Sequence, residues 1–261
     1  MLVGSFSVMN ARTNTINWRR LLGITPEFGL LAAITLTVLG QLFGSTPAKA
    51  PSGHENDQAV VKTGPLKPPA EGSIPVAFLI SEGAQVIDFT GPWEVFQDVV
   101  VPGRTDHPFR LYTVSESTSP IRASGGMKIV PDYTFENAPA PKVIVIPAQS
   151  QPNEATLEWI CRSAKSADVT MSVCTGAFVL ARSGLLSGKA ATTYHGAFVT
   201  FANQFPDIQL KRGARFVEDG NLATAGGLSS GIDLALRVVE RYFGRETAEK
   251  TAFYMEYQSR S

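Results

Sequence analysis

The chain has 261 residues, of which 44% are hydrophobic and 18% charged, an ordinary composition for a globular protein. Its 23 basic and 23 acidic side chains give a formal net charge of zero, and no basic stripe favours binding to nucleic acid. Two cysteines, Cys161 and Cys174, are too few for a disulfide framework, and their spacing alone does not show whether they pair.

Residues 1–50 are predicted to be a signal peptide or a membrane anchor rather than part of the fold. Several arginines precede an uncharged apolar run at residues 28–43, and the small residues Ala48 and Ala50 follow it, which is typical of a secretory signal. The run is shorter than the ~20 residues of a spanning helix. Because Pro51 disfavours cleavage after Ala50, an uncleaved anchor is the alternative. In either case we expect the domain to be exported, to the periplasm or the cell exterior.

Residues 51–72 are polar and rich in Pro and Gly, which is typical of a flexible tether, and the domain is predicted to occupy residues 73–261. Short apolar runs predict buried strands at 74–80, 109–114, 143–146 and 169–173. Helices are predicted from near Pro92 and over 154–165, 174–182, 197–203, 232–243 and 246–258. Strands that alternate with helices indicate a parallel sheet covered on both faces, with ligands at the carboxyl ends of its strands.

Cys174 stands where a predicted strand runs directly into a predicted helix. Small neighbours such as Gly176 and Ala177 allow the sharp turn of a nucleophile elbow. The thiol would then lie beside a helix N-terminus, whose free N–H groups favour the thiolate, so we expect a lowered thiol pKa. The alternative is a buried structural cysteine, which is also our interpretation of Cys161 on its predicted helix.

Several segments, in this order, resemble the DJ-1/PfpI family of class I glutamine amidotransferase-like proteins. They are Ser172-Val-Cys-Thr-Gly-Ala-Phe-Val-Leu-Ala181 and residues 184–186, 191–193, 215–221 and 224–233. More narrowly, they resemble the isonitrile hydratase-like branch, which also forms the N-terminal half of some AraC-type regulators. The resemblance covers about residues 74–258. It implies an α/β, flavodoxin-like three-layer sandwich with a mostly parallel central sheet, commonly assembled as a homodimer.

The resemblance also implies an acidic side chain beside the cysteine, from the loop after the first strand, and Asp88 stands at that position. A carboxyl group near a thiolate has a raised pKa and can transfer protons. From the residues alone, Asp88 could instead cap the following helix. Glu94, farther along that helix, is expected to face solvent or a subunit contact.

The sequence departs from many relatives at two places. Protease-like members have a histidine directly after the nucleophile, whereas this chain has Thr175, as the isonitrile hydratase branch does, so peptidase activity lacks its general base. Many relatives have two glycines where Ala148 and Gln149 stand. We expect backbone N–H groups at Ala148 and Gln149 to form an oxyanion pocket together with the amide of Thr175, next to Gly176. The side chain of Gln149 is expected to narrow or polarise this pocket.

His195 occupies a region that borders the active site in relatives, but a lone histidine is more often structural, so both interpretations are open. The pair Gly226-Gly227 lacks the spacing and the acidic partner of a dinucleotide-binding loop. No cluster of side chains has metal-ligand spacing. We therefore expect neither a cofactor nor a metal.

The predicted function is that of a cysteine-dependent lyase or hydrolase of small electrophilic molecules, with hydration of an isonitrile to an N-formamide as the named reaction. Cys174 would attack carbon, Asp88 would transfer protons, and Thr175 with the loop at Ala148 would stabilise developing charge. A glyoxalase or deglycase reaction needs the same parts. The alternative class is a non-enzymatic ligand or redox sensor, like the regulatory halves of AraC-type proteins. The membrane would be a partner only through an uncleaved N-terminal segment.

Overall fold

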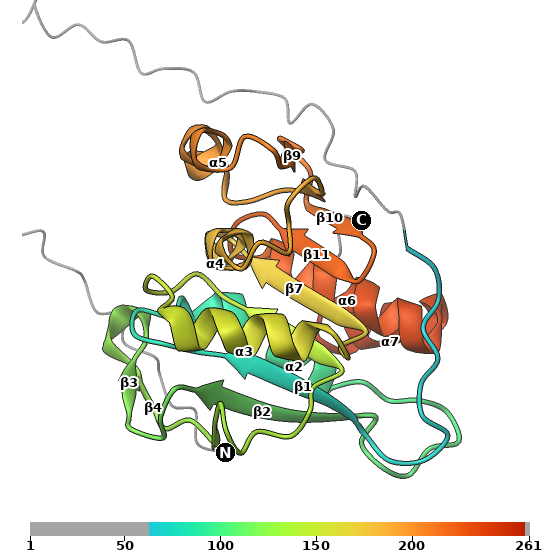
Figure 1. The fold of residues 1–261 in the computed structure, drawn as a ribbon. Coiled ribbons are helices and arrows are strands. Elements are labelled where there is room, and N and C mark those ends of the chain that lie inside the picture. The colour runs from blue at the N-terminus through green and yellow to red at the C-terminus, as the bar shows by residue number, and fades with distance from the viewer. Residues whose placement is uncertain (1–62, 259–261) are drawn as a thin grey trace, which may run out of the picture. The chain divides into compact units, whose positions relative to one another are not determined.

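The central sheet of the computed structural model, which describes residues 63–258, has seven strands in the order β10-β11-β7-β6-β1-β2-β5 (Figure 1). Every neighbouring pair is parallel except β10 with β11. The inner order β2-β1-β6-β7-β11 is the flavodoxin-like order, so the predicted fold class is confirmed. The strands are β1 (Ile74–Leu79), β2 (Phe109–Ser115), β5 (Tyr133–Thr134), β6 (Val143–Ile146), β7 (Val169–Val173), β10 (Phe216–Asp219) and β11 (Leu222–Ala225).

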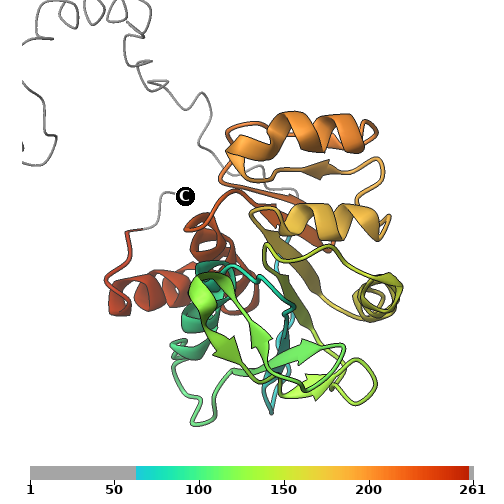
Figure 2. The same ribbon diagram turned by 90° about the vertical axis from the view of Figure 1, so that its left-hand side faces the viewer.

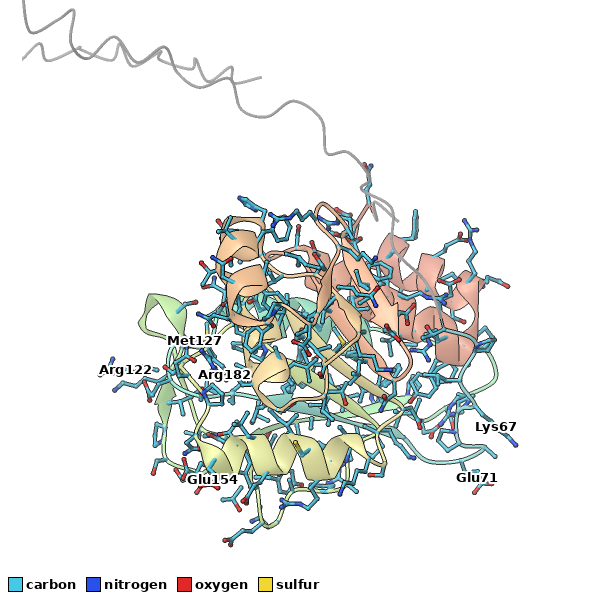
Figure 3. All side chains as sticks on the ribbon, turned by 45° about the horizontal axis from the view of Figure 1, so that its top comes forward. Lys67, Glu71, Arg122, Met127, Glu154 and Arg182 are labelled. Atoms are coloured by element: carbon cyan, nitrogen blue, oxygen red, sulfur yellow. The ribbon has the colours of Figure 1, made fainter. Side chains whose placement is uncertain are left out.

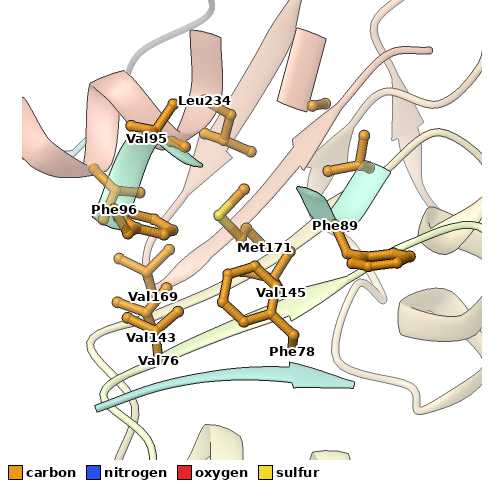
Figure 4. Close-up of a cluster of buried hydrophobic side chains, with 14 of the residues drawn as sticks. Val76, Phe78, Phe89, Val95, Phe96, Val143, Val145, Val169, Met171 and Leu234 are labelled. Carbon is orange, nitrogen blue, oxygen red and sulfur yellow. The ribbon is translucent and has the colours of Figure 1, made fainter. Parts of the chain in front are cut away.

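Helices cover both faces of the sheet, which makes three layers (Figure 2). One face carries α2 (Val86–Gln97), α6 (Ser230–Phe243) and α7 (Arg245–Tyr254), and the other carries α3 (Glu154–Ala164), α4 (Gly176–Arg182) and α5 (Phe198–Gln204). Because side chains alternate along a strand, Phe78 of β1 points into the first apolar cluster and Leu79 into the second. Figure 4 shows the first cluster, where Phe78 and Met171 of the sheet meet Phe96 and Leu234 of the helices. Full burial of such a side chain contributes about 1.5–3 kcal/mol.

Several short strands and turns lie outside the seven-stranded sheet. Two pairs of two-residue strands, β3 (Ile121–Arg122) with β4 (Lys128–Ile129) and β8 (Ala190–Ala191) with β9 (Gln209–Leu210), form small separate sheets. The 3₁₀ turns are η3 (Ser124–Gly126) and η4 (His195–Ala197). The sequence did not predict these strands, because two residues carry too little periodicity.

The predicted main strands agree with the observed ones to within one residue at each end. The helix expected near Pro92 instead begins at Val86, with Pro92 inside it. Proline is common in the first turn of a helix and rare in its interior, so its position suggested a later start. As a result, Asp88 lies in the first turn of α2 and not in a loop.

The described part of the predicted tether, residues 63–72, lies against the domain. Arg237 Nη2 donates to the Thr63 carbonyl at 3.0 Å, and Arg241 Nε donates to the Gly64 carbonyl at 3.0 Å. The backbone N–H of Leu66 donates to the Arg241 carbonyl at 2.7 Å. Both arginines also bind the fully buried Glu218 of β10. Residues 63–66 are therefore attached to α6.

Figure 3 shows Lys67 and Glu71 of this stretch on the opposite side of the domain from Arg122 and Met127. The predicted signal or anchor at residues 1–50 and the first part of the tether lie outside the described residues. Within residues 63–258, no helix is long and apolar enough to cross a membrane.

Candidate active site

The carboxyl ends of four adjacent strands bring the site together. Asp88 follows β1, Ala148 follows β6, Cys174 follows β7 and Leu228 follows β11, and these strands are neighbours in the order β1-β6-β7-β11. Ligands of open α/β sheets bind outside the carboxyl ends of their strands. Residues that are far apart in the sequence therefore meet at this edge.

Cys174 has the backbone conformation of an elbow, with a φ of 58°. A side chain in this left-handed region costs roughly 1–2 kcal/mol, so the surroundings have to hold it there. The backbone N–H of Cys174 donates to the carbonyl of Gly226 at 2.8 Å, and the hydroxyl of Thr193 donates to the carbonyl of Cys174 at 2.9 Å. Hydrogen bonds on both peptide groups thus fix the turn between β7 and α4.

Gly176 lets the first turn of α4 approach the end of β6. A Cβ atom at Gly176 would lie 2.2 Å from the carbonyl oxygen of Ile146 and 2.8 Å from the backbone of Pro147. No side chain fits at such distances, and the obstacle is backbone that cannot swing away. This close approach agrees with the expectation that a small residue at position 176 lets the elbow close.

Cys174 is 8% exposed, and the pKa of its thiol is raised to about 11, first by burial and then by the Asp88 carboxyl group. The backbone N–H groups of Thr175 and Leu228 and the Thr175 hydroxyl act on the sulfur in the opposite direction and lower the pKa. The expected lowering of the thiol pKa is therefore wrong. The N-terminal amides of α4 do favour the thiolate, but desolvation and a neighbouring carboxylate outweigh them.

Asp88 is fully buried, and its carboxyl group can accept and donate a proton near neutral pH. Its Oδ2 accepts a hydrogen bond from the backbone N–H of Ala148 at 3.1 Å, while its Oδ1 has no hydrogen-bond partner among the described residues. Burial raises its pKa to about 7, against a smaller lowering by the Ala148 N–H. The side chain thus contacts the loop after β6, not the amides of α2 that the capping alternative requires.

The predicted oxyanion pocket differs from the observed arrangement at Ala148 and Gln149. The Ala148 N–H is engaged by Asp88. The Gln149 Oε1 accepts a hydrogen bond from Ser81 Oγ at 3.0 Å, and Gln149 lines a cavity of about 330 Å³ to which Cys174 does not contribute. The groups that favour negative charge on the sulfur are the N–H and hydroxyl of Thr175, as expected, and the N–H of Leu228, which the sequence did not suggest.

Leu228 acts on the thiol through its backbone N–H, so the residue type at position 228 could not indicate this role in the sequence. The glycine pair before it, directly after strand β11, was the available clue, because a loop at that end of a parallel strand borders the site. Leu228 also lines a second cavity, of about 290 Å³, together with Tyr194, His195 and Arg215. Leu228 thus lines this cavity with one part of the residue while its N–H lowers the pKa of the Cys174 thiol.

His195 is exposed and packs against Tyr194, with their ring centroids 4.3 Å apart and the rings tilted by 57°. It is not among the groups that act on the Cys174 thiol. Cys161, half-buried on α3, donates its thiol proton to the carbonyl of Ser183 at 3.3 Å, and both cysteines are free. Among residues 63–258, no group of three His, Cys, Asp or Glu side chains could hold a metal ion. The titratable pair of the site is thus Asp88 and Cys174.

Comparison with known proteins finds relatives of this chain both in sequence and in structure. Residues 75–241 match the model of the DJ-1/PfpI family. Isonitrile hydratase from Pseudomonas putida is 34% identical over 190 residues, which cover 71% of this chain and 79% of that protein. The HTH-type transcriptional regulator GbdR of Pseudomonas aeruginosa is 28% identical over 142 residues, which cover 53% of this chain and only 38% of the regulator.

Solved structures share the fold. A ThiJ/PfpI family protein from Pseudomonas syringae superposes with a TM-score of 0.62 at 27% identity, covering 73% of this chain and 77% of that one. DJ-1beta of Drosophila melanogaster also superposes with a TM-score of 0.62, at 18% identity, covering 72% of this chain and all of that one. At that identity the second likeness concerns the fold alone.

Proposed function

This chain belongs to the DJ-1/PfpI family, and from that premise we propose that it is a cysteine-dependent enzyme that hydrates isonitriles to N-formamides. The observation that carries the proposal is the set of groups around one buried sulfur. Two backbone N–H groups, of Thr175 and Leu228, stabilise negative charge on Cys174, and Asp88 beside it offers an oxygen without a partner. The likeness to an isonitrile hydratase supports this substrate class.

In the first step, Cys174 Sγ forms a bond to the terminal carbon of the isonitrile while Asp88 accepts the thiol proton. Asp88 then delivers this proton to the same carbon, which leaves an S-linked thioimidate with a C=N bond. The N–H groups of Thr175 and Leu228 stabilise the sulfur as its charge develops. Prior ionisation would cost up to about 5 kcal/mol, the gap between the two pKa values, so we expect proton transfer and bond formation to be concerted.

In the second step, water adds to the thioimidate carbon. Asp88 accepts one proton of this water and passes it to the nitrogen. The C–S bond then breaks, the new hydroxyl becomes the formyl carbonyl, and its proton returns to the sulfur through Asp88. One isonitrile and one water thus give one N-formamide, with the thiol and the carboxyl group restored.

The test is turnover of an aliphatic isonitrile such as cyclohexyl isocyanide, with the N-formamide measured by NMR. C174A and D88N are each expected to abolish formation of the product. C161S is the matched control, because Cys161 is free but lies on α3, away from the site, and it should keep full activity. Turnover by C174A at the wild-type rate would end the proposal.

A sensor without turnover is the second candidate, and the low exposure of Cys174, 8%, favours it, since a substrate needs access to the sulfur. In that case peroxide should convert Cys174 to the sulfinate, with a mass gain of two oxygens, while isonitriles and glyoxals remain unchanged. The raised thiol pKa argues against rapid oxidation, because the thiolate is the reactive form. In the hydratase reaction Asp88 takes the thiol proton as the C–S bond forms, so no prior ionisation is needed, and we therefore favour the hydratase.

Export and assembly are part of the proposal. We expect residues 1–50 to carry the domain to the periplasm or the cell exterior, which fusion to a reporter that is active only outside the cytoplasm tests. We also expect a homodimer, which light scattering on the purified domain tests. An inactive reporter fusion or a monomeric mass would contradict the respective expectation.

A further inference from the structure

The loop of residues 226–229 lies against the elbow, since the N–H of Cys174 donates to the carbonyl of Gly226 at 2.8 Å, and the loop includes Leu228, whose N–H lowers the pKa of the Cys174 thiol. The conformation of this loop is strained. Leu228 has a φ of 50°, in the left-handed region that a leucine rarely adopts. At the start of the loop, the N–H of Gly226 donates to the carbonyl of Arg215 at 2.9 Å. Gly227 packs so closely on Tyr194 that a Cβ atom there would lie 2.7 Å from the ring. Such a loop keeps its shape only if both of its ends are held.

A polar cluster around the buried Asp233 holds the other end. Arg215 Nε donates to Asp233 Oδ2 at 2.9 Å, and the Asp233 side chain is fully buried. The Tyr257 hydroxyl donates to Asp233 Oδ1 at 3.1 Å and lies 3.5 Å from the carbonyl oxygen of Ser229, so its single proton is shared between these two acceptors. Arg215 Nη2 donates to the same hydroxyl at 3.4 Å. Burial and then Asp233 raise the pKa of Tyr257, so the hydroxyl keeps its proton.

The end of α7 turns back to bring Tyr257 to this place. Glu256 has a φ of 52°, the N–H of Tyr257 donates to the carbonyl of Ala252 at 2.9 Å, and the N–H of Glu256 donates to the carbonyl of Phe253 at 3.0 Å. These are the two bonds of a Schellman motif. Tyr257 lies beyond residue 241, where the match to the family model ends. Tyr257 thus reaches its partners, which lie within the matched region, from outside it.

We propose that Tyr257 is a positioning residue for the reactive centre: with Arg215 and Asp233, it fixes the loop of residues 226–229 so that the N–H of Leu228 points at Cys174 Sγ. Tyr257 itself does not touch the sulfur. The charged group that acts on this thiol is Asp88, which faces it from α2 and is independent of the cluster. The effect of Tyr257 on alkylation of Cys174 is independent of the proposed function, and only an effect of Tyr257 on isonitrile turnover rests on it.

The test uses the C161S background, in which Cys174 is the only cysteine, and follows its alkylation by iodoacetamide between pH 7.5 and 9.5. Y257F removes the hydroxyl and keeps the ring. Loss of one donor to a charged sulfur is expected to slow alkylation about tenfold at each pH, because a smaller fraction of the thiol is ionised. The matched control is Y254F, since Tyr254 is the last residue of α7, three residues before Tyr257, and is 71% exposed, and this variant should alkylate at the wild-type rate.

Urea unfolding of both variants separates positioning from stability. A fall in unfolding midpoint with unchanged alkylation would show a merely structural hydroxyl and overturn the proposal, and so would faster alkylation, which indicates an opened loop. If Y257F slows alkylation but no variant turns over an isonitrile, the proposed function fails and the positioning role stands. If turnover is present and Y257F alkylates normally, the positioning role fails alone.

Discussion

The carboxyl group of Asp88 binds the backbone N–H of Ala148 at 3.1 Å through one oxygen and leaves its other oxygen buried without a hydrogen-bond partner among the described residues. The first contact takes up an amide that could otherwise bind a substrate oxygen. The second feature makes the charged form of Asp88 expensive, because a buried carboxylate needs more than one donor. The same oxygen is free to take a proton from Cys174 or from water.

The buried carboxyl group predicts a dependence of stability on pH. Its pKa of about 7 in the folded protein exceeds the ~3.9 of an unfolded aspartate. Folding therefore favours the protonated form, so this contribution is complete below about pH 4 and is lost as the pH rises through about 7. Between pH 5 and pH 8, the free energy of unfolding should fall by about 2–3 kcal/mol in the wild type and stay nearly constant in D88N. Urea unfolding at both pH values checks this, and equal decreases would contradict it.

The same substitution should make Cys174 more reactive toward alkylation while it abolishes turnover. Removal of the Asp88 charge removes one cause of the raised thiol pKa, although burial, the larger cause, remains. In the C161S background, D88N should therefore react several-fold faster with iodoacetamide at pH 8. If D88N reacts more slowly, Asp88 serves as a base for the thiol even in this simple reaction, and its electrostatic effect is the smaller one.

The sheet and the elbow could be predicted from the sequence because their signals are local. The β-branched run Val143–Ile146 and the junction at Cys174 each lie within a few residues, and the structure has strands β6 and β7 where they were expected. The start of α2 was misplaced because Pro92 lies in its interior. Tertiary packing, with Phe89 and Val95 in the core, outweighs the missing hydrogen bond.

The chemistry of the site was harder to predict because it depends on contacts that are distant in sequence. The sign of the thiol pKa shift follows from burial and from Asp88, which is 86 residues away from Cys174 in the chain, and not from the adjoining helix. The N–H of Leu228 lowers the thiol pKa through the backbone, so the side chain at this position gives no sign of it. The engagement of Ala148 by Asp88 depends on the depth of burial, which a sequence pattern does not report.

G176A should strongly destabilise the fold. The added methyl group would overlap the carbonyl of Ile146 and the backbone of Pro147, so α4 has to move away from β6. We expect a loss of about 3 kcal/mol or more in the free energy of unfolding, as for severe overpacking. G64A is the control, because nothing lies within 4 Å of a Cβ atom there, and its unfolding midpoint should match that of the wild type. A stable G176A protein would show that the elbow is looser than the structure indicates.

Glu218 connects the stretch before the first strand to the domain. Its buried carboxylate binds Arg237 at 2.9 Å and Arg241 at 3.0 Å, and these arginines hold the carbonyls of Thr63 and Gly64. E218Q keeps the shape of the side chain but leaves the buried Arg241 without its counter-charge. Breaking a buried pair in this way typically costs about 3–5 kcal/mol.

Two measurements follow from E218Q. Urea unfolding should show the lower stability, and hydrogen exchange at the amide of Leu66, which donates to the Arg241 carbonyl, should become faster. E249Q is the control, because Glu249 pairs with Arg245 on the exposed side of α7 and its removal should change neither quantity. Equal protection of Leu66 in both variants would mean that the stretch is held by packing of Leu66 against the core, independently of the ion pairs.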